Sequence, residues 1–263
     1  MLLHLPEPPA EKLERSPLAL VVFQIRYDAQ PRLGTLETGL QVHEVLGGKG
    51  GRLPTIEQVQ AGNLSIQFGP EASAGQSIQT VGWRMLSTNR KTAAAFHVDA
   101  LTLETTDYGR WAGDFADLIS DALRALAEAV GPVTEHRLGL RYVDRITDLD
   151  IATAADWSGW LNSWALGPAV IDGLSEATQA TEMSSAFRID DEAAARMRVA
   201  VFPETDAQVG VVDIDVFREG SRAFDVSGIL DVVNRFHVVA KQLFFAALRP
   251  ELYRYLKGET TDD

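Results

Sequence analysis

Two long stretches of the chain have the apolar periodicity of an amphipathic helix. Apolar residues recur at spacings of three and four over about 109–130 and again over about 225–248, which is the pattern of a helix that buries one face. Gly131-Pro132 follows the first stretch and Pro250 follows the second, and both are typical signals for the end of a helix. We therefore predict two long amphipathic helices.

Shorter runs of alternating apolar and polar residues predict strands before each of these helices. In the first part of the chain we predict a strand, a short helix and three further strands, at about 18–28, 34–46, 63–69, 78–88 and 92–105. In the second part the same order is predicted at about 136–147, 153–165, 178–189, 194–202 and 207–218. The predicted order of elements in each part, including its long helix, is therefore β-α-β-β-β-α.

Two short matches indicate that the two parts are related. The triplet Ile25-Arg26-Tyr27 resembles Leu140-Arg141-Tyr142, and Val98-Asp99 is matched by Val212-Asp213. Such internal repeats are typical of duplicated structural units. We predict an α+β fold of two related β-α-β-β-β-α halves, with antiparallel sheets that long amphipathic helices cover on one face. The predicted boundaries are an N-terminal extension at 1–16, a first half at 17–131, a second half at 132–256 and a disordered acidic tail at 257–263.

Charge and composition exclude several classes of protein. The 263 residues include 37 Asp or Glu and 24 Lys or Arg, for a net charge of -13. This charge repels phosphate backbones, so we expect no nucleic acid partner. The chain has no cysteine, which excludes disulfides, zinc–thiolate sites and thiol nucleophiles. The longest apolar runs are too short for a membrane span, and Pro6 interrupts the apolar start, so we expect no membrane partner and place the protein in the cytoplasm.

Three arginines form the clearest functional pattern. On a strand, Arg137, Arg141 and Arg145 stand in a row on one face, because alternate residues point to the same side. Two interpretations remain open. The row binds a carboxylate or phosphate group of a ligand, or it pairs with aspartates such as Asp213 and Asp215 on a neighbouring strand.

We predict a ligand-binding or partner-binding site at the junction of the two halves. Its charged residues are Arg26, Arg137, Arg141 and Arg145, and its wall residues are Trp83 and Trp157. Arginine suits planar anionic groups, and tryptophan is frequent among residues that dominate binding energy.

Motifs for catalysis are absent from the sequence. The patterns HExxH, GxSxG and the Walker loop do not occur, so we assign no catalytic residue, no metal site and no cofactor. For proton transfer we consider His97 with Asp99, which a strand would place on the same face, and Glu104 and Tyr108 downstream of them.

Several blocks of the sequence resemble a known family. Ser16-Pro17-Leu18 leads into Ile25-Arg26-Tyr27, the triplet Leu103-Glu104-Thr105 precedes Tyr108, and a later block reads Arg-Leu-Gly-Leu-Arg-Tyr. In these blocks the chain resembles a sporadically distributed family of uncharacterised bacterial proteins of about 250 residues, a likeness that carries no activity or catalytic residue with it. Asp144 stands where that family more often has asparagine. The resemblance implies a bacterial protein from defence-linked or toxin–antitoxin gene neighbourhoods.

These features favour a non-enzymatic binding or regulatory module that recognises a protein partner or a small anionic ligand. An enzyme that processes nucleotides or phosphoesters is one alternative, with His97 as its proton-transfer residue. An acidic antitoxin-like or defence-associated regulator is another. Because the last helix has more apolar residues than one face can bury, we also expect a homodimer through this C-terminal helix.

Overall fold

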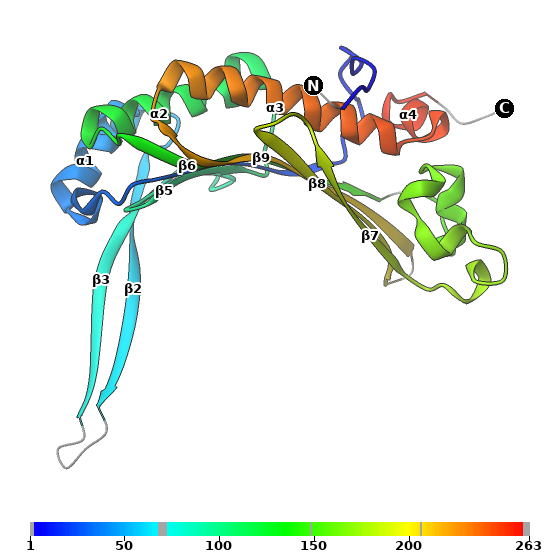
Figure 1. The fold of residues 1–263 in the computed structure, drawn as a ribbon, viewed down its shortest axis with the longest axis horizontal. Helices are drawn as coiled ribbons and strands as arrows, with labels where there is room; N and C mark the ends of the chain where they lie inside the picture. The colour runs from blue at the N-terminus through cyan, green and yellow to red at the C-terminus, as the bar shows by residue number, and fades with distance from the viewer. Residues whose placement is uncertain (1–2, 68–72, 148, 206, 260–263) are drawn as a thin grey trace. The chain divides into compact units, whose positions relative to one another are not determined.

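The computed structural model describes residues 3–67, 73–147, 149–205 and 207–259. Within these ranges the strands are β1 (Leu18–Tyr27), β2 (Thr55–Gln67), β3 (Ser73–Leu86), β4 (Thr92–His97), β5 (Ala100–Thr105), β6 (Thr134–Ile146), β7 (Thr181–Arg188), β8 (Ala193–Glu204) and β9 (Ala207–Ala223). The α-helices are α1 (Leu36–Val45), α2 (Ala116–Ala129), α3 (Val226–Ala247) and α4 (Pro250–Leu256). Figure 1 labels these elements along the chain.

The predicted fold class is wrong. The strands of the described residues belong to one sheet, in the order β2-β3-β4-β5-β1-β6-β9-β8-β7, rather than to two related sheets. The two parts of the chain also differ in content, since the first contributes β1–β5 and the second β6–β9. Most helical segments are short, with ten residues in α1 and seven in α4. Two long helices that each cover their own sheet are therefore not the architecture of this protein.

The predicted helix at 153–165 is replaced by short 3₁₀ turns at Ala154–Gly159 and Ser163–Ala165. The reason is a set of hydrogen bonds to the end of α3. The side-chain amide of Asn162 donates to the carbonyl oxygens of Ala246 at 2.8 Å and Leu248 at 3.0 Å. These carbonyls lie at a helix end, where they have no partner within the helix. Long-range capping therefore overrides the spacing of Trp157, Trp160 and Trp164, which lie three and four residues apart as on one face of a helix.

The helix predicted at 109–130 begins later than expected. A wide turn at Trp111–Phe115 precedes α2, and Gly113 within it has a φ of 76°. This left-handed conformation favours glycine and breaks the regular helical backbone. The apolar stripe of the sequence runs through the turn without a change of period, so periodicity alone did not indicate the break.

The chain divides into two compact units built from non-consecutive segments. Unit 1 comprises Met1–Val22, Gly139–Glu219 and Asp231–Asp263, and unit 2 comprises Phe23–Leu138 and Gly220–Leu230. The boundary expected between residues 131 and 132 rests on the sequence repeat and stays a prediction. Of the predicted tail, residues 260–263 lie outside the described residues.

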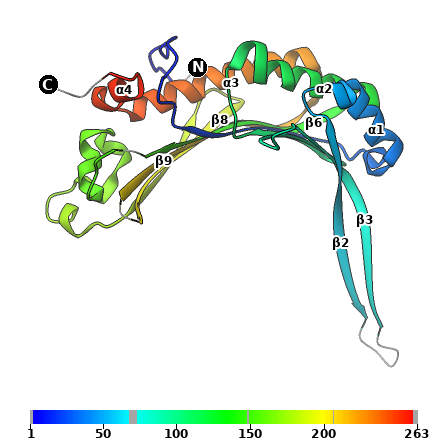
Figure 2. The ribbon, with the colours of Figure 1, turned by 180° about the vertical axis from the view of Figure 1, so that it is seen from behind.

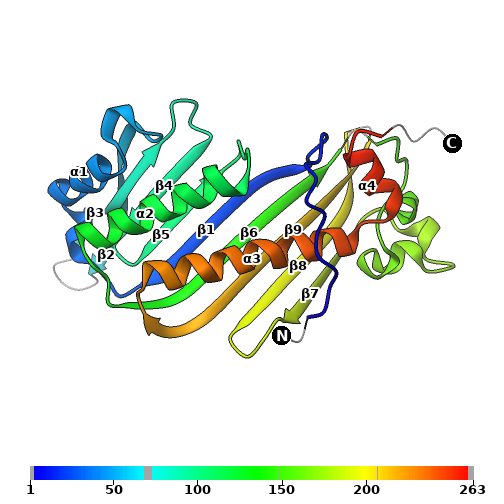
Figure 3. The ribbon, with the colours of Figure 1, turned by 90° about the horizontal axis from the view of Figure 1, so that it is seen from above.

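Unit 2 is a meander of strands with helices on one face. Strands β2 to β5 pair antiparallel in sequence order, and α2 lies over β4 and β5 (Figure 3). Phe96, Leu101 and Leu103 are fully buried on the helix-covered face, as alternation along a strand requires. The paired strands β2 and β3 extend away from the helices of this unit (Figures 1 and 2). Among the described residues of unit 2, no helix lies over the other face of the meander, which we name the helix-free face.

Unit 1 also consists of antiparallel strands with a helix over one face. Strands β7, β8 and β9 pair antiparallel, and the part of α3 in this unit lies over β9 (Figure 3). Along β8 the buried Met197 and Val199 alternate with the exposed Arg196 and Arg198. The arginines therefore lie on the face that α3 does not cover.

Candidate functional site

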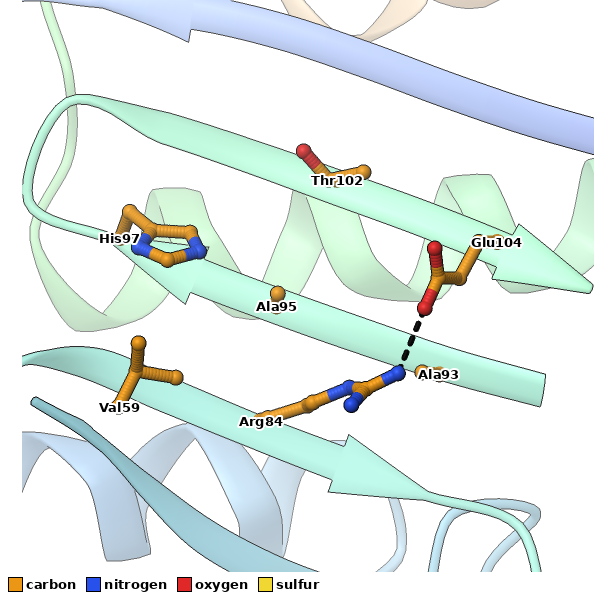
Figure 4. Close-up of a pocket in the computed structure, with 7 residues that line it drawn as sticks. All are labelled: Val59, Arg84, Ala93, Ala95, His97, Thr102 and Glu104. Atoms are coloured by element: carbon orange, nitrogen blue, oxygen red, sulfur yellow. Dashed lines mark hydrogen bonds and ion pairs between the residues drawn. The ribbon is translucent and has the colours of Figure 1, made fainter. Parts of the chain in front are cut away.

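The helix-free face of unit 2 contains a pocket that small residues create. In β4, Ala93 and Ala95 alternate with residues of the helix-covered face, and Ala95 lies opposite Arg84 of β3 and Thr102 of β5. The short alanine side chains form a floor between the longer side chains of the neighbouring strands. The resulting pocket has a volume of about 350 Å³. It is lined by Val59, Arg84, Ala93, Ala95, His97, Thr102 and Glu104 (Figure 4).

An ion pair closes one end of the pocket. Nη2 of Arg84 donates to Oε1 of Glu104 at 2.6 Å, across the intervening strand β4 (Figure 4). Each side chain is 41% exposed, so the pair contributes at most about 1 kcal/mol to stability. Its main effect is geometric, because it holds a guanidinium and a carboxylate in fixed positions beside the alanine floor.

A chain of hydrogen bonds orients the hydroxyl of Thr102. Nη1 of Arg137 donates to Oε1 of Gln24 at 3.3 Å, and Nε2 of Gln24 donates to Oγ1 of Thr102 at 3.3 Å. The arginine can only donate, so it fixes the amide oxygen of Gln24 on its own side. Thr102 then accepts from Gln24, and its single O–H is the donor that it can present to a ligand.

His97 lies at the opposite end of the pocket from the ion pair (Figure 4). Ala93, which lies opposite Glu104, and His97 are both on β4, and four residues of strand span about 13 Å. The backbone oxygen of His97 accepts a hydrogen bond of 2.7 Å from the hydroxyl of Tyr27. Burial raises the pKa of Tyr27 well above its usual value, so this donor keeps its proton. His97 and Glu104 are thus too far apart to hydrogen-bond directly and can contact two ends of one ligand.

The predicted arginine row is divided between the two units. Arg141 of unit 1 binds Asp213 through two hydrogen bonds of 2.7 Å, from Nε and Nη2, and this contact raises the pKa of Arg141. Nη2 of Arg198 lies 3.7 Å from the same carboxylate, and Arg145 pairs with Glu204. For Arg141 the geometry therefore corresponds to the second interpretation, a pairing with aspartate across strands. Arg137 belongs to unit 2 and contacts Gln24.

The two predicted wall tryptophans lie in the cores of their units. Trp83 is 4% exposed and Trp157 is 0% exposed. Each ring packs on a glycine, since an added Cβ would lie 2.5 Å from the ring of Trp83 at Gly39 and 2.5 Å from the ring of Trp157 at Gly210. Nε1 of Trp83 donates to the backbone oxygen of Thr35 at 3.1 Å. In this structure the rings serve packing, and neither lines the pocket.

The remaining candidates are placed apart from one another. Arg26 is exposed at the end of β1. The strand β4 ends at His97, so Asp99 lies in the following turn rather than on the same strand face as expected. Tyr108 comes after the end of β5 and packs against Phe115, with ring centres 6.1 Å apart. His97 therefore shares its pocket with Glu104, whereas neither Asp99 nor Tyr108 is among the residues that line it.

The sequence analysis did not name Arg84 or Thr102 as site residues, and it considered Glu104 only for proton transfer with His97. Their proximity depends on the register of three strands, which residue spacing within one strand does not reveal. The only local signal is the run Ala93-Ala94-Ala95. In a strand, such small residues indicate a depression wherever the neighbouring strands carry longer side chains.

Within the described ranges, no group of three or more His, Asp or Glu side chains is arranged to hold a metal ion. The same part of the chain contains no helix with the length and apolar character needed to cross a membrane. No model of a known protein family matches the chain, and no curated protein matches it either.

Proposed function

We propose that the protein is a non-enzymatic binding module whose pocket on the helix-free face of unit 2 binds a small anionic ligand. One observation carries the proposal, namely that hydrogen-bond donors of Arg84, His97 and Thr102 line one pocket of about 350 Å³. Pockets for small ligands typically have volumes of about 300–1,000 Å³ and a few placed polar groups. The volume fits a ligand of metabolite size.

The arrangement of charges further defines the ligand. The oriented hydroxyl of Thr102 and the guanidinium of Arg84 favour an acceptor such as a carboxylate. Glu104, at the same end as Arg84, favours a donor on the ligand. We therefore infer a small carboxylate that also carries an amino or hydroxyl group, as in an amino acid or a hydroxy acid.

A catalytic function is supported less well by this geometry. General acid–base catalysis requires a proton donor or acceptor within hydrogen-bond distance of the reacting group, usually with a partner that orients it. The two titratable groups at the ends of the pocket are His97 and Glu104, separated by about 13 Å of strand. The groups can bind two ends of a ligand but do not orient one another.

The other expectations remain proposals beside this one. A regulator that uses its acidic surface is consistent with the net charge of -13, and electrostatic attraction would then depend on salt. A cytoplasmic location, a bacterial origin and a homodimer through the C-terminal helix also stay predictions.

Filling the pocket should weaken ligand binding. Ala95→Leu places a larger side chain on the floor between Arg84 and Thr102, so we expect the affinity to fall at least tenfold. The measurement is isothermal titration of the full chain with L-glutamate, L-malate, citrate and inorganic phosphate. Ala186→Leu is the matched control, because Ala186 is exposed on β7 and lies outside the pocket.

A second variant tests the hydroxyl. Thr102→Val keeps the shape of the side chain and removes its O–H, which should weaken binding by about threefold to tenfold if one neutral hydrogen bond is lost. The proposal is contradicted if none of the four probes binds the wild-type chain. It is also contradicted if a probe binds Ala95→Leu as tightly as it binds Ala186→Leu.

A further inference from the structure

The segment 3–17 of unit 1 lies across two helices of the same unit. It contains Pro6, Pro8 and Pro9 and forms neither helix nor strand. Figure 3 shows it crossing over α3 near α4. Proline fixes φ near −65° and favours an extended backbone with solvent-facing carbonyls. Such a backbone is suited to recognition by side-chain donors.

Two side chains of α3 donate to the backbone oxygens of this segment. Nζ of Lys241 donates to the oxygen of Pro9 at 3.1 Å. Nε2 of Gln242 donates to the oxygens of Leu5 and Pro6, both at 3.2 Å. Burial lowers the pKa of Lys241, as expected for an ammonium group that the segment partly covers. The helix thus binds the proline-rich backbone at three carbonyl groups.

A carboxylate in the segment makes the second set of contacts. Nζ of Lys257 lies 2.8 Å from Oε2 of Glu11, and the hydroxyl of Tyr253 donates to the same oxygen at 3.3 Å. The contact with Lys257 lowers the pKa of Glu11 and raises that of Lys257. The site therefore distinguishes an acidic segment from a basic one.

Aromatic side chains complete the surface under the segment. The guanidinium of Arg15 stacks over the ring of Tyr255 at 4.5 Å, and its backbone N–H donates to the oxygen of Leu256 at 2.9 Å. Phe245 and Tyr253 pack edge to face with ring centres 5.6 Å apart. The apolar residues that suggested a homodimer interface are thus partly engaged within unit 1.

We propose that the surface of α3 and α4 is a recognition site for a proline-rich, acidic peptide segment of a partner protein. The segment 3–17 occupies this site in cis and displays the chemistry that the site selects. That chemistry is an extended backbone with carbonyls at the prolines, and a carboxylate two residues after the Pro8-Pro9 pair. Aromatic surfaces with side-chain donors are a recurring way to bind proline-rich segments.

The resident segment also limits access to the site. A tethered ligand competes at an effective concentration in the millimolar range when its linker is short. A partner segment must therefore compete with the resident segment. It binds only if its own affinity is high enough or if the contacts of the resident segment with α3 and α4 have been weakened. The test below uses this competition and leaves the pocket of unit 2 unchanged.

The experiment measures binding of a fluorescein-labelled peptide with the sequence of residues 3–17 to full-length variants by fluorescence anisotropy. Glu11→Lys places two like charges at the contact with Lys257 and should displace the resident segment. We expect the peptide to bind Glu11→Lys at least threefold more tightly than it binds the wild-type chain. Glu7→Lys is the matched control, since Glu7 is exposed in the same segment, and it should behave as wild type.

A charge exchange keeps the test independent of folding defects. In the double variant Glu11→Lys with Lys257→Glu, the resident segment regains an ion pair while the acidic peptide meets a carboxylate, so peptide binding should fall below that of Glu11→Lys. A peptide in which Pro6, Pro8 and Pro9 are alanine should bind Glu11→Lys at least threefold more weakly. Equal affinity of the peptide for all variants, or no binding to Glu11→Lys at millimolar concentration, overturns the proposal.

Discussion

Replacing Asp144 with asparagine is expected to raise the free energy of unfolding at pH 8 by several kcal/mol. Asp144 lies on the helix-covered face of β6 and is only 6% exposed, and burial raises its pKa to about 8. In the unfolded chain the carboxyl ionises near pH 4, so folding must keep it neutral or bury its charge. The difference between the pKa values of the folded and the unfolded chain corresponds to a loss of stability of up to about 5 kcal/mol at pH 8. Asparagine has nearly the same shape and no charge to lose.

The buried carboxyl of Asp144 should also make the free energy of unfolding depend on pH. Between about pH 4 and pH 8 the folded chain holds the proton of Asp144 and the unfolded chain does not, so this group makes stability fall as pH rises. Burial lowers the pKa of His237 to about 4. The unfolded chain therefore binds the proton of His237 between about pH 4 and 6.5, which makes stability rise with pH in that window.

The two contributions oppose each other up to about pH 6.5, and above it that of Asp144 remains. Urea denaturation at half-unit steps from pH 5 to pH 8 should show wild-type stability falling above pH 6.5 and Asp144→Asn stability staying level. Asp150→Asn, at an exposed position, is the control and should keep the wild-type profile. A wild-type slope that persists in Asp144→Asn would refute the assignment.

Truncating Trp157 to alanine is expected to lower the free energy of unfolding by about 4 kcal/mol. Its ring is fully buried and rests on Gly210 of β9, so its loss leaves a large cavity beneath a strand that cannot collapse onto it. Trp157→Phe retains part of the ring and should cost less. Gly210→Ala should also destabilise, because the new methyl group would lie 2.5 Å from the ring.

Chemical denaturation followed by circular dichroism measures these differences. Trp164→Ala is the matched control, since Trp164 is 46% exposed and surface substitutions usually change stability by less than about 0.5 kcal/mol. If Trp157→Ala and Trp164→Ala lose the same small amount of stability, the packing role assigned to Trp157 is wrong.

Some local features could be predicted because they depend on short-range patterns. The helix predicted at 225–248 corresponds to α3 at Val226–Ala247. The alternation on β6 separates the exposed Arg141 from the buried Leu140 and Tyr142, as the period of a strand requires. Asp144 shares this buried face.

Other features depend on information that neighbouring residues do not carry. The strand β2 begins at Thr55, before the predicted 63–69, because Ile56 and Val59 lie three residues apart and so do not form the apolar alternation of a strand. One sheet replaces two because strand order is decided by pairings far apart in sequence. The pocket was missed for the same reason, since Arg84 and Glu104 meet only across β4.

The hairpin of β2 and β3 has a consequence for how this protein can change in evolution. Strand β2 lies at the edge of the sheet, and β3 pairs with β4 only through Gly82–Leu86. Within the described ranges, no further strand pairs with the outer part of the hairpin and restricts its register. Natural variants should differ there by two residues in each strand, since equal and even additions to both strands keep the pairing and leave every side chain on its original face. The length of the hairpin could then change while the strands that line the pocket stay the same.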